Sequence, residues 1–224
     1  MCAVFLKMRH FLLRFLLLFL LAAFAAQARE PITVLERGEV PVEHRATPAA
    51  HGMRLTLAFL DGSGWSPEAI LAAVRESARI LGQCGVALES AELLRVEAPI
   101  RFRDFFTPTS RELARSLPLG KPTVYFVAGT RQRPAFDAEA IGRSNSRSRL
   151  ELADTVWVTR GTRDLGIVLA HELAHVLMDS GEHSDETGNL MRDESAPENT
   201  RLSDAQCARL REIGSANGLL RPPR

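Results

Sequence analysis

His171-Glu172-Leu173-Ala174-His175 forms an HExxH sequence inside an apolar segment with helical periodicity. At 3.6 residues per turn, the two histidines fall on one stripe of a helix, about 40° apart in projection. Two imidazoles placed in this way can bind one tetrahedral zinc ion, and Glu172 lies close enough to act on a zinc-bound water. The residues expected on the buried face are Val168, Leu169, Leu173, Val176 and Leu177. The motif therefore predicts a core helix whose edge carries a zinc site.

The N-terminus has the pattern of a secretory signal peptide over residues 1–28. Three basic residues and no acidic residue come before an uninterrupted apolar run at 15–26. Ala26-Gln27-Ala28 then matches a small-x-small cleavage site. The apolar run is shorter than the roughly 20 residues that a membrane span requires. We therefore expect an exported protein, periplasmic or secreted, with no membrane attachment after cleavage; an uncleaved anchor is the alternative.

The charge of the chain gives no reason to expect nucleic acid or an anionic membrane as a partner. The signal peptide contains three of the 28 basic residues and none of the 27 acidic ones, so the mature chain has a net charge of −2. Proteins that bind such polyanions commonly have a strongly basic domain or patch.

Two regions follow the signal peptide. Residues 29–52 are polar and contain three prolines, which is typical of an extended arm, a linker or a short pro-segment. Residues 53–224 have the length and composition of one soluble domain. Their patterns predict strands at 53–60, 86–96, 123–128, 140–142 and 155–159, and helices that begin at Ser66, Thr109, Asp164 and Ser203. This irregular alternation favours an α+β or mixed α/β domain around one twisted sheet.

The connection at 131–154 is unusually long for a compact domain. Only Ala140-Ile141-Gly142 within it indicates a short strand. The connection is either one wall of a substrate cleft, with an edge strand that can pair with an extended peptide, or an exposed surface loop.

A third metal ligand is expected after the HExxH helix. Gly181 can adopt the left-handed conformation that ends a helix and reverses the chain. A chain reversed there can bring His183 to the metal, which leaves the fourth position for water, as in catalytic zinc sites. Asn189-Leu190-Met191 and a capped helix from Ser203 follow.

These features resemble the metzincin clan of zinc endopeptidases. The resemblance rests on HELAH, on a histidine downstream of a glycine, and on a methionine that matches the Met-turn of the clan. The order of strands and helices loosely extends it over 53–220. The resemblance implies that His171, His175 and His183 bind zinc, that Glu172 is the general base, and that Met191 lies beneath the metal.

The spacing departs from the clan pattern, HExxHxxGxxH. The clan's glycine and third histidine follow the second histidine by three and six residues, whereas Gly181 and His183 follow His175 by six and eight. His183 can still reach the metal if the helix continues for one more turn before it reverses. Otherwise the third ligand would be one of three nearby carboxylates: Glu182, Asp179 or Asp185.

The function expected from these residues is zinc-dependent hydrolysis of a peptide or protein substrate bound in an extended form. Zinc would polarise the scissile carbonyl, and Glu172 would take the proton of the attacking water and pass it to the leaving amine. One alternative is a glutamate-type zinc peptidase with Glu194 or Glu198 as the third ligand. The other is a non-catalytic domain that keeps the fold for binding, against which the intact Glu172 argues.

Cys84 and Cys207 are expected to form a disulfide. Cys2 is removed with the signal peptide, so two cysteines remain in an exported chain, where oxidation is the default. The alternative is a pair of separate buried thiols.

Overall fold

The sheet at the centre of the fold has the strand order β1-β3-β2-β5-β8-β7, and β9 pairs with β2 beyond this path. The computed structural model describes residues 30–41 and 51–222, so the expected signal peptide lies outside the described residues. Contacts divide the chain into Met1–Pro31 and Ile32–Arg224, and the fold below is that of the second unit. Its main strands are β1 (Thr33–Pro41), β2 (His51–Leu60), β3 (Val86–Glu97), β5 (Thr123–Phe126), β7 (Ala138–Ile141), β8 (Thr155–Val158) and β9 (Leu220–Arg221). A separate parallel pair joins β4 (Asp104–Phe105) to β6 (Gly129–Thr130).

The sheet is mixed, as predicted. The four central strands β3, β2, β5 and β8 run parallel to one another, whereas β1 pairs antiparallel with β3 at one edge and β7 pairs antiparallel with β8 at the other. The strand predicted at 140–142 is therefore the edge strand β7, which begins at Ala138.

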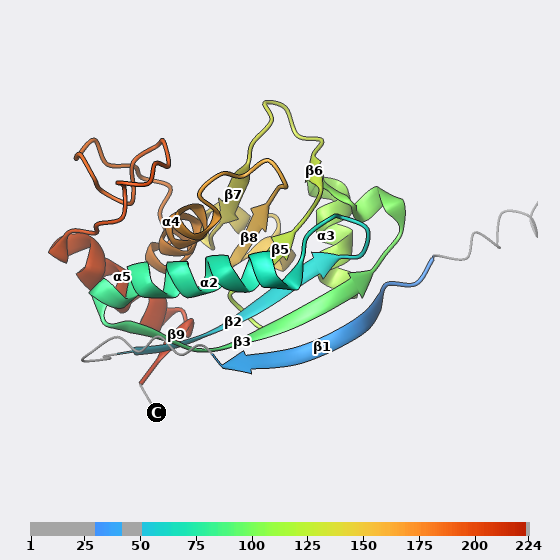
Figure 1. Cartoon of the computed structure of the whole chain (residues 1–224), viewed down its shortest axis with the longest axis horizontal. Coiled ribbons are helices and arrows are strands. Elements are labelled where there is room, and N and C mark those ends of the chain that lie inside the picture. Colours follow the sequence, from blue (N-terminus) through green and yellow to red (C-terminus); the bar gives the residue numbers. More distant parts are fainter. Residues whose placement is uncertain (1–29, 42–50, 223–224) are drawn as a thin grey trace, which may run out of the picture. The chain divides into compact units, whose positions relative to one another are not determined.

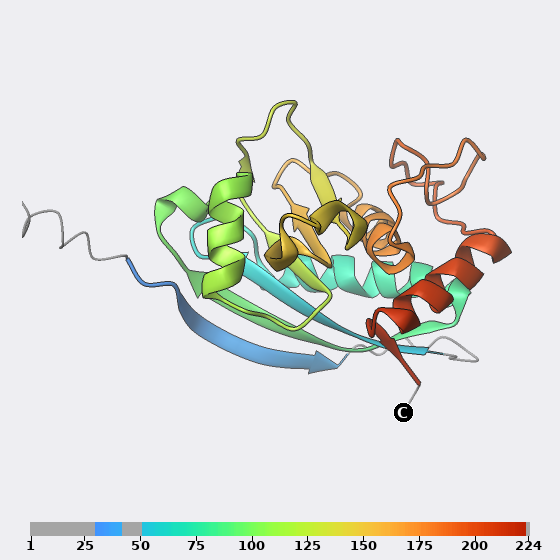
Figure 2. The ribbon, with the colours of Figure 1, turned by 180° about the vertical axis from the view of Figure 1, so that it is seen from behind.

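The helices cover both faces of the sheet (Figures 1 and 2). Three of them pack on one face: α2 (Pro67–Leu81), α4 (Leu165–Met178) and α5 (Asp204–Ala216). α3 (Thr107–Ser116) packs on the other face. α2 begins as predicted, because the Ser66 hydroxyl accepts a hydrogen bond from the Ala69 N–H and Pro67 occupies the first turn. None of the helices described is long and apolar enough to cross a membrane.

α4 is the most buried helix of the described chain. Every residue from Gly166 to Met178 is buried, including the polar residues of the HExxH sequence. A helix that is apolar on nearly all sides is stable only when other elements surround it. Here α2, α5, β7 and β8 do so. This packing explains why the segment carries so few polar side chains.

Two segments differ from the sequence predictions. Residues 33–41 are extended, as expected for the segment 29–52, but they form β1 and pair with β3 from Thr33↔Glu97 to Pro41↔Ser90. Sheet membership depends on a distant partner strand, which local composition does not reveal. α3 begins at Thr107, two residues earlier than predicted, because Thr109 does not cap it: its hydroxyl donates to the Phe106 carbonyl.

Candidate metal centre

Three imidazoles meet at the C-terminal end of α4. His171 and His175 lie one turn apart on the helix, and the chain after the helix reverses to bring His183 beside them. The Nε2 atom of His175 is 2.9 Å from Nε2 of His171 and 3.2 Å from Nε2 of His183. One ligand nitrogen from each ring lies within 4.8 Å of the others. The structure thus brings together the three histidines predicted from the sequence.

The reversal occurs at Asp179, and the prediction of Gly181 is wrong. Asp179 is left-handed (φ 45°), and its N–H bonds carbonyls of the last helical turn. Aspartate tolerates this conformation better than most residues, and the carboxylate of Asp179 also accepts a hydrogen bond from the Ser144 N–H at 2.8 Å. Because this helix end depends on a partner in the loop after β7, local sequence favoured the glycine instead.

The other nitrogen of each imidazole faces an oxygen atom. Nδ1 of His171 is 2.7 Å from the Leu190 carbonyl, and Nδ1 of His175 is 2.6 Å from the Ser180 carbonyl. A carbonyl oxygen can only accept a hydrogen bond, so in both rings Nδ1 carries the proton and Nε2 carries a lone pair. This tautomer leaves both Nε2 atoms available as metal ligands.

The short contact between Nε2 of His171 and Nε2 of His175 is therefore not a hydrogen bond. Two lone pairs at 2.9 Å repel each other unless a cation lies between them. Zn–N bonds of about 2.0–2.1 Å in a tetrahedral site place neighbouring nitrogens about 3.3 Å apart. The separations of 2.9 and 3.2 Å come close to this value. The donor set and its tautomers fit a metal ion such as zinc.

The charges of the two helical histidines suit the same purpose. Burial lowers the pKa of His171. Burial, and then the neighbouring His171, lower the pKa of His175 from 6.5 to about 4. Both rings are neutral at neutral pH, which is the form that binds a metal.

Glu172 lies in the wall of the same site. Glu172 is 8% exposed, and the pKa of its carboxyl group is raised from 4.5 to about 8, mainly by burial. The charge of Glu139 contributes to this rise in pKa, whereas a hydrogen bond from the Ala140 backbone opposes it. A cation held by the histidines would also lower it, because an opposite charge stabilises the carboxylate. The carboxyl group is thus able to change its protonation state near neutral pH.

Met191 lies in a buried turn that supports the histidines. Its N–H donates to the Asn189 side chain at 2.9 Å, and the side-chain amide of Asn189 donates to Gln206 of α5 at 3.0 Å. Gln206 also completes the predicted capping box with Ser203. The sequence predicted the cap of α5 at Ser203 but not the hydrogen bonds between Gln206 and Asn189. The only local signal for this contact was that asparagine commonly forms turns.

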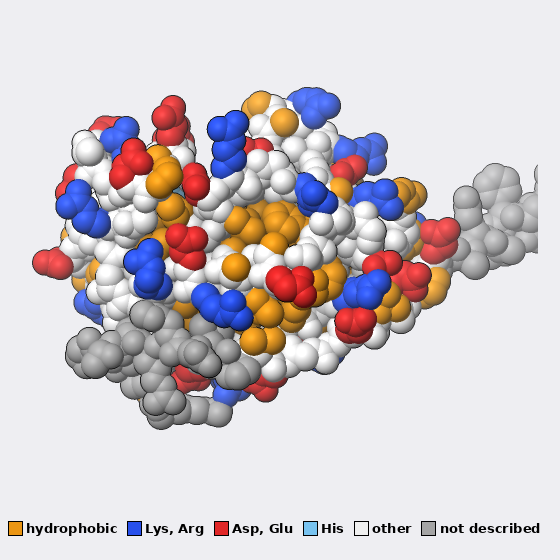
Figure 3. Space-filling model, viewed as in Figure 1, with side chains coloured by type: hydrophobic (Ala, Val, Ile, Leu, Met, Phe, Trp, Pro, Cys, Tyr) orange, Lys and Arg blue, Asp and Glu red, His pale blue; other side chains and the backbone are white. Residues whose placement is uncertain are grey.

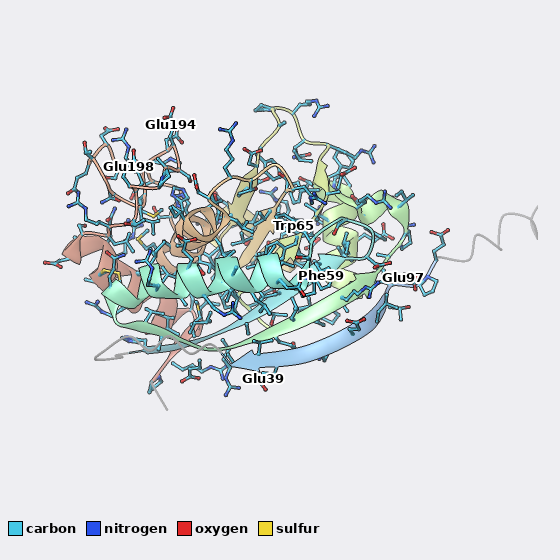
Figure 4. The ribbon with its side chains drawn as sticks, viewed as in Figure 1. Glu39, Phe59, Trp65, Glu97, Glu194 and Glu198 are labelled. Atoms are coloured by element: carbon cyan, nitrogen blue, oxygen red, sulfur yellow. A yellow bond between two sulfur atoms is a disulfide. The ribbon has the colours of Figure 1, made fainter. Side chains whose placement is uncertain are left out.

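The carboxylates considered as alternative ligands do not join the cluster. Glu182 pairs with Arg209 at 2.9 Å, and Asp179 holds the helix end. Glu194 and Glu198 lie on the long loop between α4 and α5 (Figure 4). Among the residues that the structure describes, the group able to hold a metal consists of His171, His175 and His183 alone.

A cleft of about 640 Å³ contains the histidines and Glu172. β7 and the residues after it form one wall, and the loop carrying Ser180 and Asp193 forms the other. Figure 3 shows the surface hollowed between these two parts of the chain. Part of the connection 131–154 therefore lines a cleft. This agrees with the interpretation of the connection as a cleft wall.

Cys84 and Cys207 form the predicted disulfide, with their Cα atoms 4.8 Å apart. The bond joins the end of α2 to the first turns of α5.

Comparisons with known proteins give the fold and no family. No protein-family model and no curated protein sequence matches the chain. Among solved structures, the chain is similar to the crystal structure of metalloproteinase-II from Bacteroides fragilis, with a TM-score of 0.50 and 19% sequence identity. The match covers 79% of this chain and 57% of the other, so the chain spans little more than half the length of that protein. At this identity the likeness shows a shared fold, and the chain has the fold of a metalloproteinase.

Proposed function

We propose that the protein is an exported, zinc-dependent metallopeptidase that cleaves peptide bonds within peptides or proteins. The observation that carries the proposal is the cluster of three Nε2 atoms, two of them with fixed tautomers, beside a buried glutamate in a cleft. Three neutral imidazoles with an open fourth position are a common ligand set of catalytic zinc. The fold shared with a metalloproteinase supports the same conclusion.

In this mechanism the residues of the chain hold the metal and move one proton. His171, His175 and His183 hold zinc, which when bound supplies a Lewis acid that polarises the scissile carbonyl and acidifies water. The carboxylate of Glu172 takes the proton from the attacking water and delivers it to the nitrogen of the leaving amine.

The substrate is proposed to bind in an extended form along β7. This strand is at the edge of the sheet, and it lines the cleft beside Glu172. The backbone groups on the free edge of such a strand can pair with an extended peptide.

Export to the periplasm or the medium is supported by the disulfide, because such bonds persist in oxidising compartments. The signal-peptide pattern over 1–28 points to the same route.

Metal analysis of the purified mature protein, combined with peptide hydrolysis by wild type and Glu172→Ala, tests the proposal. We expect about one zinc per chain in both proteins, and a loss of at least two orders of magnitude in turnover in the variant, as for removal of a general base. Undiminished turnover by the variant would exclude this mechanism. Zinc binding without turnover by wild type would instead favour the non-catalytic binding domain.

A further inference from the structure

The three imidazoles are oriented by two different kinds of acceptor. Buried backbone carbonyls accept from Nδ1 of His171 and His175 at 2.7 and 2.6 Å. Nδ1 of His183 faces a carboxylate oxygen of Asp193 at 3.4 Å. The side chains of His183 and Asp193 are 39% and 87% exposed. The third histidine is thus the only one of the cluster that faces a charged acceptor on the surface.

The backbone between these two residues places them side by side. The Ser184 N–H donates to the Met191 carbonyl at 2.7 Å, which closes the loop that begins next to His183 and ends next to Asp193. Arg192 strengthens this closure by donating to the Asp185 carbonyl at 3.0 Å. These hydrogen bonds therefore hold the backbone at His183 close to the backbone near Asp193, within reach of the observed side-chain contact.

We propose that Asp193 is a positioning residue for His183, completing a carboxylate–histidine–metal arrangement at the third ligand. This inference rests on the proposed metal centre. The carboxylate fixes the proton on Nδ1, directs Nε2 toward the other two rings, and makes the imidazole a stronger donor to the metal. A metal at Nε2 would make the Nδ1–H more acidic and so a stronger donor to the Asp193 carboxylate.

The same arrangement explains how His183 can be oriented as a ligand although it follows His175 by eight residues and not by six. His171 and His175 receive their orientation from a rigid helix and from carbonyls in the core. His183 lies on an exposed loop, where an imidazole without a partner rotates freely. Asp193 supplies the constraint that the helix supplies to the other two, and it comes from the same turn whose Leu190 carbonyl orients His171.

Zinc affinity, measured by competition with a chromophoric chelator, tests this role. We expect Asp193→Ala to lower the affinity about 10- to 100-fold, as for loss of an outer partner of a ligating histidine. Asp193→Asn keeps an oxygen acceptor without the charge and is expected to bind with intermediate affinity. The matched control is Glu198→Ala, which removes a carboxylate from the same loop and is expected to leave the affinity unchanged.

Two further measurements make the result decisive. The melting temperature of the metal-free protein should be the same for Asp193→Ala and wild type, because the exposed carboxylate acts on the metal site alone. The inference is wrong if Asp193→Ala and Glu198→Ala bind zinc equally well, or if a fall in metal-free stability accounts for the lost affinity. His183→Ala separates this inference from the proposed function: if it too retains full zinc affinity, the proposed metal centre itself fails.

Discussion

At the scale of single residues, the candidate site depends on which nitrogen of each imidazole is free. Hydrogen bonds to Leu190 and Ser180 leave lone pairs on Nε2 of His171 and His175, and these two nitrogen atoms are only 2.9 Å apart. Such an arrangement is unfavourable without a cation. The residues of the site are therefore held in the form that a metal requires.

His183→Ala should lower zinc affinity by several orders of magnitude, because it removes one of three protein ligands. Glu182→Ala and Asp185→Ala should have little effect, since Glu182 already pairs with Arg209 and neither carboxylate belongs to the histidine cluster. Zinc content after dialysis against a dilute chelator measures the difference. Zinc that is lost with Glu182 or Asp185, and not with His183, would contradict the assignment.

Glu172→Gln should stabilise the metal-free protein at alkaline pH and not at acid pH. The folded-state pKa of Glu172 is raised to about 8, so the fold retains a proton that the unfolded chain releases above its own pKa of about 4.5. Stability is fully present below about pH 4.5 and is lost as the pH rises through about 8. Glutamine does not ionise and avoids this loss, which is on the order of a few kcal/mol.

The measurement is the melting temperature of both metal-free proteins between about pH 5 and about pH 9. Groups far from residue 172 titrate alike in the two proteins, so the difference between them reports on Glu172 and the groups coupled to it, such as Glu139. A difference that does not grow with pH would show that the carboxyl group ionises as easily in the fold as in water.

At the scale of elements, the buried turn around Met191 connects α5 to the histidines. Asn189 exchanges hydrogen bonds with Gln206, and the Leu190 N–H donates to the Arg201 carbonyl at 2.6 Å. These bonds position the Leu190 carbonyl against His171. The orientation of a residue on α4 thus depends on the start of α5.

Asn189→Ala should destabilise the protein by about 1–3 kcal/mol, because it leaves the buried Met191 N–H and the half-buried Gln206 amide without these partners. Zinc affinity should fall as well, since the turn that orients His171 loosens. Urea unfolding of the metal-free protein and chelator competition measure the two effects. Ser215→Ala, an exposed change on α5, is the control and should alter neither; an equal response would show that the turn has no special role.

At the scale of the whole described unit, the segment that follows α2 is joined to the start of α5. The disulfide links Cys84 to Cys207, and Gln83 donates to the Thr200 carbonyl and accepts from the Leu202 N–H. The segment that directly follows α2 therefore holds the end of the loop between α4 and α5.

Cys84→Ser combined with Cys207→Ser should lower the free energy of unfolding by about 3–5 kcal/mol, because the bond closes a loop of 123 residues in the unfolded chain. Thermal melts of the oxidised protein, of the double variant and of wild type with a reductant measure this change. The reductant should lower the melting temperature of wild type and leave the double variant unaffected. Equal melting temperatures with and without the reductant would mean that the bond adds no stability.

The sequence by itself determined most of the elements and the composition of the cluster. The periodicity around HExxH predicted the core helix, local capping predicted the starts of α2 and α5, and the two remaining cysteines predicted the disulfide. These features depend on residues a few positions apart or on composition alone. The sequence predicted that His171, His175 and His183 come together, and the structure shows this cluster. Their role as metal ligands stays a prediction.

Only the tertiary structure decided how those residues are held and what their environment does. The end of α4 at Asp179 depends on the Ser144 N–H, the pairing of β1 depends on β3, and the raised pKa of Glu172 depends on burial beside β7. The acceptors for the imidazoles, including Asp193, come from the chain after the helix. Each of these interactions joins residues whose proximity arises from the packing of separate elements, which no local pattern of residues encodes.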